Sequence, residues 1–326
     1  MTNETSVPPD RRECCPGCGS HSVKPIPGIG KALDAPTRTA VFRQNEYRIL
    51  RCADCGLAFK DSILTEEQFS RYYADFEFST WEASEMYPTE RPVLRFLQTL
   101  PPGSKVLDFG CSTGRLLAHV QGGLECHGFE INQEAAAKAA ARGIRMVGKW
   151  DDLATHAGSV DALVMMDVFE HIEKPTGLIE SLLRLVKPGG SLIIATGNAD
   201  SRACRVDLPN FWYFRNIQHV AMLTRKYCEF IAEKFRLRIS VWCELSHYKV
   251  TPFQKGEQYL RQFIYSCQHR NPNSLISRLF RTIPVLRRCV NWKIPPPFTA
   301  SKDHVVVIFE KTSTRESSGG SIQAQI

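Results

Sequence analysis

The chain has 326 residues, of which 43% are hydrophobic and 23% charged, a composition typical of a globular protein. It contains no run of about 18 apolar residues, and its N-terminal segment is polar, so we expect neither a transmembrane helix nor a secretory signal. We expect a cytoplasmic, reducing location, in which some of the twelve cysteines bind metal and do not form disulfides.

The net charge of +7 is uneven along the chain. Residues 236–326 hold 14 Lys and Arg against 5 Asp and Glu, whereas residues 1–235 carry a slight negative excess. A basic C-terminal region indicates an anionic partner, such as a phosphorylated substrate, an anionic lipid or nucleic acid. A solvated basic surface without a partner fits the composition equally well.

Four cysteines in the N-terminal region are spaced as two metal-binding knuckles. Cys15 and Cys18 form one C-x-x-C-G motif, and Cys52 and Cys55 form a second, with Cys14 as a spare that could compete with Cys15. Zn²⁺ prefers four such thiolates in a tetrahedron. We predict a structural zinc site in a small β-hairpin ribbon, because four thiolates leave no open position for catalysis.

The segment that follows the ribbon is predicted to be helical. Thr65 is a helix-start signal, and Pro88 or Pro92 begins a second helix. Aromatic residues recur at helical spacing in the first helix, at Phe69, Tyr72, Tyr73 and Phe76. We expect this stripe to pack the ribbon on the next domain; it could instead wall a substrate pocket.

From Lys105 onward, strand patterns alternate with helix patterns. The expected strands are 105–109, 126–129, 144–148, 162–166, 191–195, 237–242 and 305–309, and the expected helices are 133–141, 175–186 and 225–235. The 175–186 helix should end at the stop signal Lys187-Pro188-Gly189-Gly190. This alternation predicts an α/β fold with a doubly wound, mainly parallel sheet and a ligand at the carboxyl ends of strands one and two.

A glycine turn follows the first of these strands, in KVLDFGCSTGRLL at 105–117. Ser112 takes the middle glycine position of a dinucleotide motif, and Asp108 precedes the turn, which disfavours a pyrophosphate and suits a ligand with an ammonium and a sulfonium group. Glu130 ends the second strand, where a carboxylate can accept hydrogen bonds from both hydroxyls of an adenosine ribose.

These segments resemble the class I S-adenosylmethionine (SAM)-dependent methyltransferases. More narrowly, they are similar to bacterial members with an N-terminal zinc ribbon, often linked to sugar or cell-surface biosynthesis. The resemblance is carried by VLDFGCSTG at 106–114, GFE at 128–130, VDALVMMDVFEHI at 160–172, LLRLVKPGGSLIIATGN at 182–198 and the W-Y-F…Q-H stretch at 212–219. It implies a Rossmann-like seven-stranded sheet and SAM as the cofactor.

The resemblance also implies roles for individual residues. The turn and Asp108 would hold the methionine end of SAM, Glu130 the ribose, Ile131 and Asp151 or Asp152 the adenine, and Asp167 would line the mouth between cofactor and acceptor. The implied cofactor-binding residues are Asp108, Gly110, Ser112, Gly114, Glu130, Ile131, Asp151, Asp152 and Asp167. Ser112 departs from the family pattern, and Gly197-Asn198 stands where Pro-Asn is usual, which puts the rigidity of that loop in doubt.

Methyl transfer to a hydroxyl or amine can require a general base. His171 and His219 lie after strands four and five, at the catalytic edge of the sheet, and are our candidate bases together with Asp167. Glu170 with His171 could instead bind a divalent cation. Pro209 and the aromatic residues after it suit a loop that covers an acceptor, and ordinary loop packing explains them as well.

A basic segment is inserted before the last strand. Its apolar residues at helical spacing, with arginines around them, predict a basic amphipathic helix over 273–290. This helix could contact an anionic membrane surface, act as a lid or pack in an oligomer.

The predicted organisation is a zinc ribbon at 1–62, a helical linker or cap at 63–100, a SAM-binding core at 101–244, a basic helical insertion at 245–304, a last core strand at 305–311 and a disordered tail at 312–326. The predicted function is SAM-dependent methyl transfer to a small molecule, most plausibly a sugar, a nucleotide-sugar or a lipid-linked glycan precursor. Two alternatives are an RNA methyltransferase, disfavoured because residues 1–62 lack a dense basic and aromatic surface, and a non-catalytic SAM- or zinc-binding module.

Overall fold

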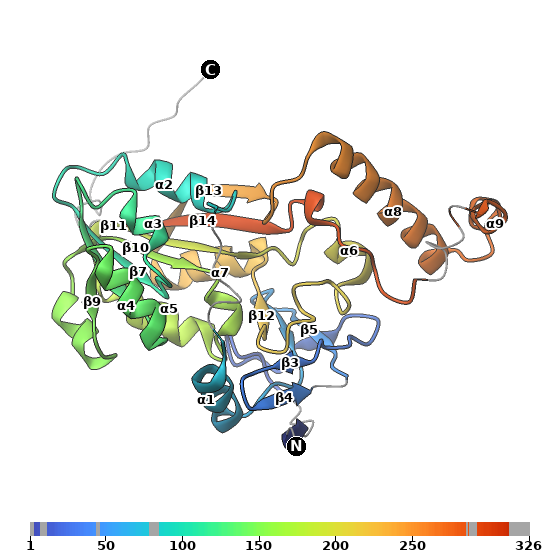
Figure 1. The fold of residues 1–326 in the computed structure, drawn as a ribbon, viewed down its shortest axis with the longest axis horizontal. Helices are drawn as coiled ribbons and strands as arrows, with labels where there is room; N and C mark the ends of the chain where they lie inside the picture. The colour runs from blue at the N-terminus through green and yellow to red at the C-terminus, as the bar shows by residue number, and fades with distance from the viewer. Residues whose placement is uncertain are drawn as a thin grey trace.

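The fold is organised around a seven-stranded sheet with the order β13-β14-β11-β10-β7-β8-β9 (Figure 1). The structure is a computed structural model that describes residues 3–6, 12–43, 46–77, 85–284, 286 and 292–312. The strands of this sheet are β7 (Lys105–Phe109), β8 (Glu125–Phe129), β9 (Arg145–Val147), β10 (Val160–Met166), β11 (Val186–Gly197), β13 (Leu237–Leu245) and β14 (His304–Lys311).

All strands of this sheet but one run in the same direction. Neighbouring strands from β11 to β9 pair in parallel, and only β14 is antiparallel to its neighbours β11 and β13. This is a Rossmann-like, mainly parallel seven-stranded sheet, so the predicted fold class is confirmed.

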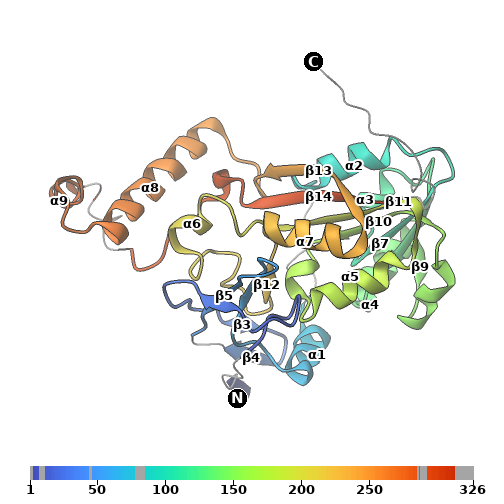
Figure 2. The same cartoon turned by 180° about the vertical axis from the view of Figure 1, so that it is seen from behind.

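Helices cover both faces of the sheet (Figures 1 and 2). One apolar core packs the sheet against α2 (Glu90–Leu97), α3 (Arg115–Ala118) and α4 (Gln133–Ala141). The other packs it against α5 (Pro175–Leu183) and α7 (Arg225–Phe235). The predicted bounds of α4 and α7 are confirmed, and Asn132 and Thr224 cap these helices by accepting hydrogen bonds from backbone N–H groups of the first turn.

The predicted helix stop at residues 187–190 is wrong in its position. The helix ends at Leu183, and β11 begins at Val186, before the Lys-Pro-Gly-Gly sequence. Val186 pairs with Val160, and Ser191 pairs with Ala162, so the four intervening residues form a bulge in the strand. Gly189 has a φ angle of 77° there, a conformation that glycine adopts without strain.

The N-terminal region forms two small sheets and a helix. β2 (Val23–Pro25), β5 (Ile49–Cys52) and β6 (Ala58–Lys60) are antiparallel, as expected for a ribbon. A two-residue strand from the core, β12 (Ala221–Met222), extends this sheet by pairing with β6. A second sheet holds β1 (Asn3–Ser6), β3 (Ala35–Pro36) and β4 (Ala40–Arg43), and α1 (Glu66–Asp75) begins at the predicted Thr65 cap.

The junction between ribbon and core contains a fully buried lysine. The Lys60 ammonium donates to the carbonyl of Asn216 at 2.8 Å and lies 4.4 Å from the ring centre of Tyr47. The Tyr47 hydroxyl in turn donates to the carbonyl of Pro209 at 2.7 Å. Burial lowers the pKa of Lys60. The ribbon is therefore hydrogen-bonded to the loop between β11 and β12.

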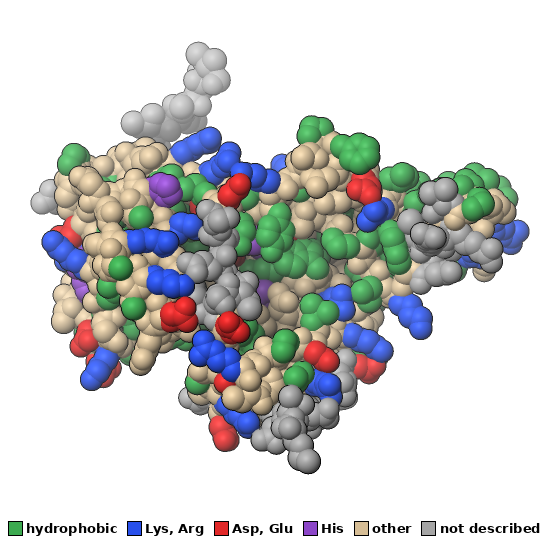
Figure 3. Space-filling view, in the orientation of Figure 1, with side chains coloured by type: hydrophobic (Ala, Val, Ile, Leu, Met, Phe, Trp, Pro, Cys, Tyr) green, Lys and Arg blue, Asp and Glu red, His purple; other side chains and the backbone are tan. Residues whose placement is uncertain are grey.

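The segment between β13 and β14 is a projecting helical arm (Figures 1 and 2), formed by α8 (Pro252–Arg270) and α9 (Leu275–Thr282). Apolar side chains are exposed along it (Figure 3); Phe253 and Leu275 are each 83% exposed. Of the helix predicted at 273–290, α9 occupies the first part, and residues 285 and 287–290 lie outside the described residues, as does the predicted disordered tail from residue 313 on. Membrane contact of this region stays a prediction.

No helix within the described residues is long and apolar enough to span a bilayer.

Candidate active site

The glycine turn between β7 and α3 has three residues with positive φ angles, Gly110 (82°), Ser112 (51°) and Gly114 (72°). A Cβ atom at Gly110 would lie 2.4 Å from Cγ2 of Val168, and one at Gly114 would lie 2.9 Å from Cγ1 of Ile144. Both positions therefore require glycine for space as well as for conformation. Ser112 is exposed, so its side chain meets no such obstacle.

Asp108 lies in β7, two residues before this turn, and is 4% exposed. Its Oδ1 atom has no hydrogen-bond partner in the described part of the protein. Burial, together with the charges of Glu130 and Glu90, raises the pKa of Asp108 to about 8. A buried carboxylate without a partner favours a cationic ligand and opposes a pyrophosphate.

The Glu130 side chain is hydrogen-bonded to backbone N–H groups, one of which belongs to the glycine turn. Its carboxylate accepts hydrogen bonds from the N–H groups of Ser112 at 2.9 Å and Asn132 at 2.8 Å. Burial raises the pKa of Glu130, and these two N–H groups oppose the shift. Each carboxylate oxygen can accept a further hydrogen bond, so Glu130 is oriented and can still bind a pair of hydroxyls.

The predicted adenine contacts lie near an aromatic group that the sequence analysis missed. Ile131 is 66% exposed, and Asp151 and Asp152 begin an exposed 3₁₀ turn, where Asp152 accepts from the N–H of Lys149 at 3.0 Å. Trp150, just before this turn, is 47% exposed and packs edge-on against Phe109 and Phe129, whose rings stack at 5.0 Å. The sequence did hold a signal for this aromatic group, because Trp150 stands between the strand that ends at Val147 and the two aspartates.

Acidic, histidine and tyrosine side chains converge at the carboxyl edge of β10 and β11. We call this group the rim cluster; it consists of Asp167, Glu170, His171, Tyr213, His219, His247 and His304. It includes all three predicted catalytic residues. Asp167 has a φ angle of 49° and a side chain that is 34% exposed, which makes it more open to solvent than His171 at 18%.

The two predicted histidines contact each other, with ring centres 4.8 Å apart. Nδ1 of His219 donates to the carbonyl of Tyr213 at 2.7 Å, and Nδ1 of His171 lies 2.9 Å from the Tyr73 hydroxyl. Burial lowers the pKa of His171 to about 4 and also lowers the pKa of His219. Both rings are therefore neutral at pH 7.

Glu170 lies beneath these histidines and is 1% exposed. It accepts hydrogen bonds from Thr196 at 2.6 Å and from Tyr213. The ligand atoms of Glu170, His171 and His219 lie within 4.8 Å of one another, a spacing that a metal ion could bridge. Because both oxygens of Glu170 already accept from hydroxyl groups, this contact set fits a structural carboxylate better than a cation ligand.

Two further histidines of the rim cluster were missed by the sequence analysis. His304 begins β14 and is fully buried; its Nδ1 lies 3.2 Å from Oδ1 of Asp303 and its Nε2 lies 4.0 Å from Oδ1 of Asp167. Burial opposes the charge of His304, but Asp303 and Asp167 outweigh it and raise the pKa. Burial lowers the pKa of His247 to about 4, and its ring stacks on His304 at 4.3 Å.

Tyr87 connects the rim cluster to the glycine turn. Its ring stacks on His247 at 4.7 Å and lies 5.0 Å from the guanidinium carbon of Arg115, the first residue of α3. Arg115 is held by Glu90 of α2 at 2.8 Å. The space between the glycine turn and the rim cluster is thus bounded by Tyr87, although its segment precedes the sheet in the sequence.

Part of this chain is similar to known proteins. Residues 81–239, just under half of the chain, match the family model described as "Methyltransferase domain". This stretch therefore resembles a methyltransferase domain. Curated relatives of the domain are named ubiquinone biosynthesis O-methyltransferase; that of Thiobacillus denitrificans is 31% identical over 121 residues, which cover 34% of this chain and 52% of the relative. The relative in Escherichia coli O7:K1 is 33% identical over 111 residues, 31% of this chain and 46% of the relative.

The chain spans about half the length of the curated relatives that it matches. Among solved structures, a complex of the Haloferax volcanii Trm112 methyltransferase activator and a putative methyltransferase aligns with a TM-score of 0.47 and 16% identity, over 70% of this chain and 90% of that chain. A SAM-dependent methyltransferase from Archaeoglobus fulgidus gives 0.45 and 14%, over 76% and 100%.

The matched stretch contains the glycine turn and most of the rim cluster, but not all of the site. His247 and His304 follow it in the sequence, and the four predicted zinc ligands precede it. The Sγ atoms of Cys15 and Cys55, and those of Cys18 and Cys52, lie 3.5 Å apart, and all four lie within 4.8 Å of one another. The two knuckles therefore meet, as their spacing predicts.

The buried carboxyl of Asp108 should make stability depend on pH. An unfolded aspartate titrates near about pH 4, and in the folded protein the pKa is raised to about 8. Between these values the folded state binds more protons, so this group lowers the free energy of unfolding as the pH rises. We expect Asp108→Asn to gain stability relative to the wild type across this window, measured by denaturant unfolding without ligand. A parallel gain in the exposed-site control Asp151→Asn would contradict the assignment.

Proposed function

We propose that the protein is a SAM-dependent methyltransferase that acts on a small-molecule acceptor. The observation that carries the proposal is the buried Asp108 carboxyl group, whose Oδ1 has no hydrogen-bond partner among the described residues, beside a turn that excludes side chains at positions 110 and 114. A ligand with an ammonium group satisfies this carboxylate, whereas a dinucleotide places a pyrophosphate against it. SAM supplies an activated methyl group on a sulfonium.

We call the glycine turn together with Asp108, Glu130, Ile131 and Trp150 the SAM cradle. Its residues divide the recognition of SAM among them. Asp108 binds the ammonium, and Glu130 accepts hydrogen bonds from the ribose hydroxyls while the N–H groups of Ser112 and Asn132 fix its orientation. Trp150 and Ile131 offer apolar surface to the adenine, beside the exposed carboxylates of Asp151 and Asp152. These groups hold the cofactor at the edge of the sheet where the rim cluster lies.

The names of the relatives favour a hydroxyl acceptor, from which a proton must leave. Asp167 is the rim carboxylate most open to this space, and the neutral rings of His171 and His219 can accept a proton. His304, held between Asp167 and Asp303, stabilises the negative charge of Asp167. Much of the remaining acceleration comes from positioning, since the sulfonium is already a good leaving group.

The finer prediction of a sugar, a nucleotide-sugar or a lipid-linked glycan precursor as the acceptor remains part of this proposal. Trp212, Tyr87 and Tyr248 surround His247, with Tyr248 45% exposed. Aromatic faces of this kind suit the apolar side of a sugar ring. Tritium transfer from labelled SAM into a cell extract, followed by separation of the products by class, would identify the acceptor.

The glycine turn provides a direct test of cofactor binding. Gly110→Ala places a methyl group against Val168 and strains the backbone, so we expect SAM affinity to fall by roughly 10- to 100-fold, the equivalent of about 1.4–2.8 kcal/mol. Isothermal titration calorimetry measures this affinity. Gly122→Ala, at a site with open space, is the matched control. Binding of NAD without binding of SAM to the wild type would overturn the proposed function.

The rim cluster provides a test of the base. Asp167→Asn retains a residue that tolerates the positive φ angle, so we expect normal SAM affinity with a loss of roughly 10²–10⁴-fold in kcat. His171→Ala and His219→Ala, assayed with the acceptor found above, separate the candidates. Near wild-type turnover in all three variants, with SAM binding intact, would show that none of them is the base.

We also propose that the four cysteines bind a structural Zn²⁺. The donor set is chemically suited to it, because four thiolates from two knuckles converge and the N–H of Gly17 lies 3.4 Å from Sγ of Cys15. Bound zinc would supply cross-links between the knuckles, and the closed set leaves no position for chemistry.

Metal analysis of cysteine variants tests this site. We expect about one zinc per chain in the wild type and in Cys14→Ser, and loss of zinc in Cys18→Ser, which replaces the most exposed of the four ligands. Equal zinc content in the two variants would contradict the ligand assignment.

A further inference from the structure

A second concave site lies beside the rim cluster, at the same edge of the sheet. It is a cleft of about 640 Å³ formed by the segments that follow β11 and β13, the start of α8 and the turn before β14. None of its charged residues belongs to the SAM cradle or the rim cluster. We call it the basic cleft; its cationic lining residues are Arg202, Arg205, Lys249, Lys255 and Lys302.

The charges of the basic cleft are not balanced. Among the described residues, only two carboxylates line it, those of Asp200 and Glu244, and Asp200 is already paired with Arg51 at 3.2 Å. Lys249 pairs with Glu85. In the described part of the chain, Arg202, Lys255 and Lys302 form no ion pair; Arg202 instead lies 5.9 Å from the ring centre of Tyr259. The cleft thus carries positive charge that no carboxylate within it neutralises.

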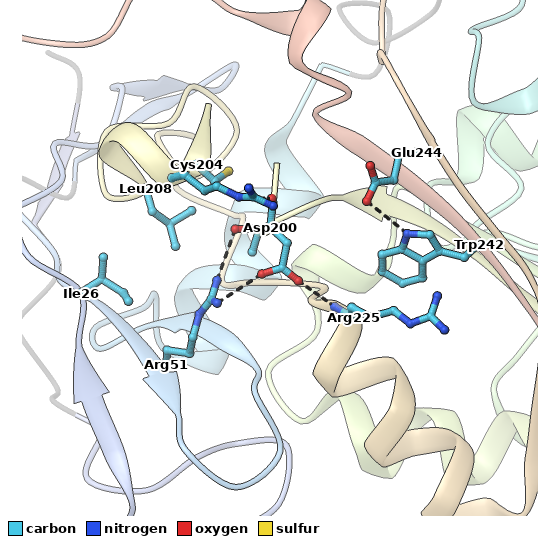
Figure 4. Close-up of a pocket in the computed structure, with 10 residues that line it drawn as sticks. Ile26, Arg51, Asp200, Cys204, Leu208, Arg225, Trp242 and Glu244 are labelled. Atoms are coloured by element: carbon cyan, nitrogen blue, oxygen red, sulfur yellow. Dashed lines mark hydrogen bonds and ion pairs between the residues drawn. The ribbon is translucent and has the colours of Figure 1, made fainter. Parts of the chain in front are cut away.

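A neighbouring cavity differs from the basic cleft in how its charges are paired. This cavity, of about 690 Å³, lies between the ribbon, α7 and β13, and it shares Asp200, Arg205 and Glu244 with the basic cleft (Figure 4). Here Arg51 reaches Asp200 from the ribbon, and Arg225 lies over Trp242 and pairs with Glu229 at 2.9 Å. Because Arg51 and Arg225 already have acidic partners, this cavity offers an anion less than the basic cleft does.

Two features direct the basic cleft toward an anion with several negative oxygens. Its unpaired cations come from three separate segments, so one anion with oxygens on more than one side can contact them together. The cleft also includes residues around the start of α8, a 19-residue helix whose N-terminal dipole favours negative charge.

Tyr248 joins the basic cleft to the rim cluster. It lines the cleft, and its ring lies 4.5 Å from that of His247, 5.9 Å from that of Tyr87 and 5.9 Å from that of Trp212. A ligand whose anionic group lies in the cleft can therefore extend along these aromatic side chains to Asp167.

We propose that the basic cleft binds a phosphate or diphosphate group of the methyl acceptor, while the acceptor hydroxyl lies at Asp167. This inference rests on the proposed function for the identity of the ligand, but the anion site can be tested without methyl transfer. Arg202 and Lys255 then determine acceptor specificity, and they act from outside the machinery that binds SAM.

The test compares two double variants of the full chain by calorimetry with inorganic pyrophosphate. Arg202→Gln/Lys255→Gln removes two cations from the cleft, and we expect it to weaken pyrophosphate binding by about tenfold or more. Arg278→Gln/Lys293→Gln removes two cations of the same C-terminal region outside the cleft, and should bind as the wild type does. Unchanged SAM affinity in both shows that they are folded.

Equal pyrophosphate affinity in the two double variants would overturn the inference, whereas absence of SAM binding to the wild type would overturn the proposed function instead. Uridine diphosphate in solution and neutral-lipid vesicles that contain a polyprenyl diphosphate distinguish the two sources of the group. Loss of either interaction in the cleft variant alone supports the site and assigns its source. Retention of both contradicts it.

Discussion

The site depends on the single antiparallel strand of the main sheet. Because β14 runs against its neighbours, its first residue, His304, lies at the edge where the parallel strands end. Asp303, fully buried just before it, accepts hydrogen bonds from the N–H of His247 at 2.9 Å and from the indole of Trp212 at 3.1 Å. One buried carboxylate therefore holds two distant segments, at Trp212 and His247, beside its neighbour His304.

The cradle and the rim cluster use burial in opposite ways. In the rim cluster, the buried carboxylate of Glu170 accepts hydrogen bonds from Thr196 and Tyr213, so this group is satisfied without a ligand. In the cradle, one oxygen of Asp108 has no partner within the described part of the chain, which costs free energy in the folded protein, on the order of 1–3 kcal/mol for a buried polar group. A cationic ligand recovers that cost on binding. In the proposed function, part of the affinity for the cofactor thus comes from stability that the ligand-free protein gives up.

Local sequence patterns predicted most strands of the main sheet and some of the residues of the candidate site. Strand and helix periodicity gave the order of elements, and the C-x-x-C spacing predicted the cysteine cluster, because both depend on residues close in sequence. The bulge at 187–190 was mistaken for a helix stop, since Pro-Gly-Gly disrupts a strand and ends a helix alike. Tyr87, His247 and His304 were missed because only the tertiary fold places them beside Asp167. No local pattern distinguishes such a histidine from one in any other loop.

For the arm and the basic cleft, too, the sequence indicated one property and only the folded structure showed another. The surplus of basic residues after position 236 was evident from the sequence. The role of this charge was not evident, because the cations of α9 lie between Lys255 and Lys302 of the cleft in the sequence, and only the folded arrangement separates the two sets. The cleft also takes Arg202 and Arg205 from the loop after β11, which lies in the part of the chain with a slight negative excess.

The pairing of β12 with β6 means that the ribbon is no detachable module. Tyr227 of α7 is fully buried, and a Cβ at Gly17 of the first knuckle would lie 2.9 Å from its ring. A core expressed without the ribbon would expose this tyrosine and leave the edge of β12 open to other chains, a recognised route to aggregation. Attempts to shorten the protein for crystallisation, or to exchange ribbons between relatives, should therefore retain the knuckles together with residues 208–227 as one folding unit.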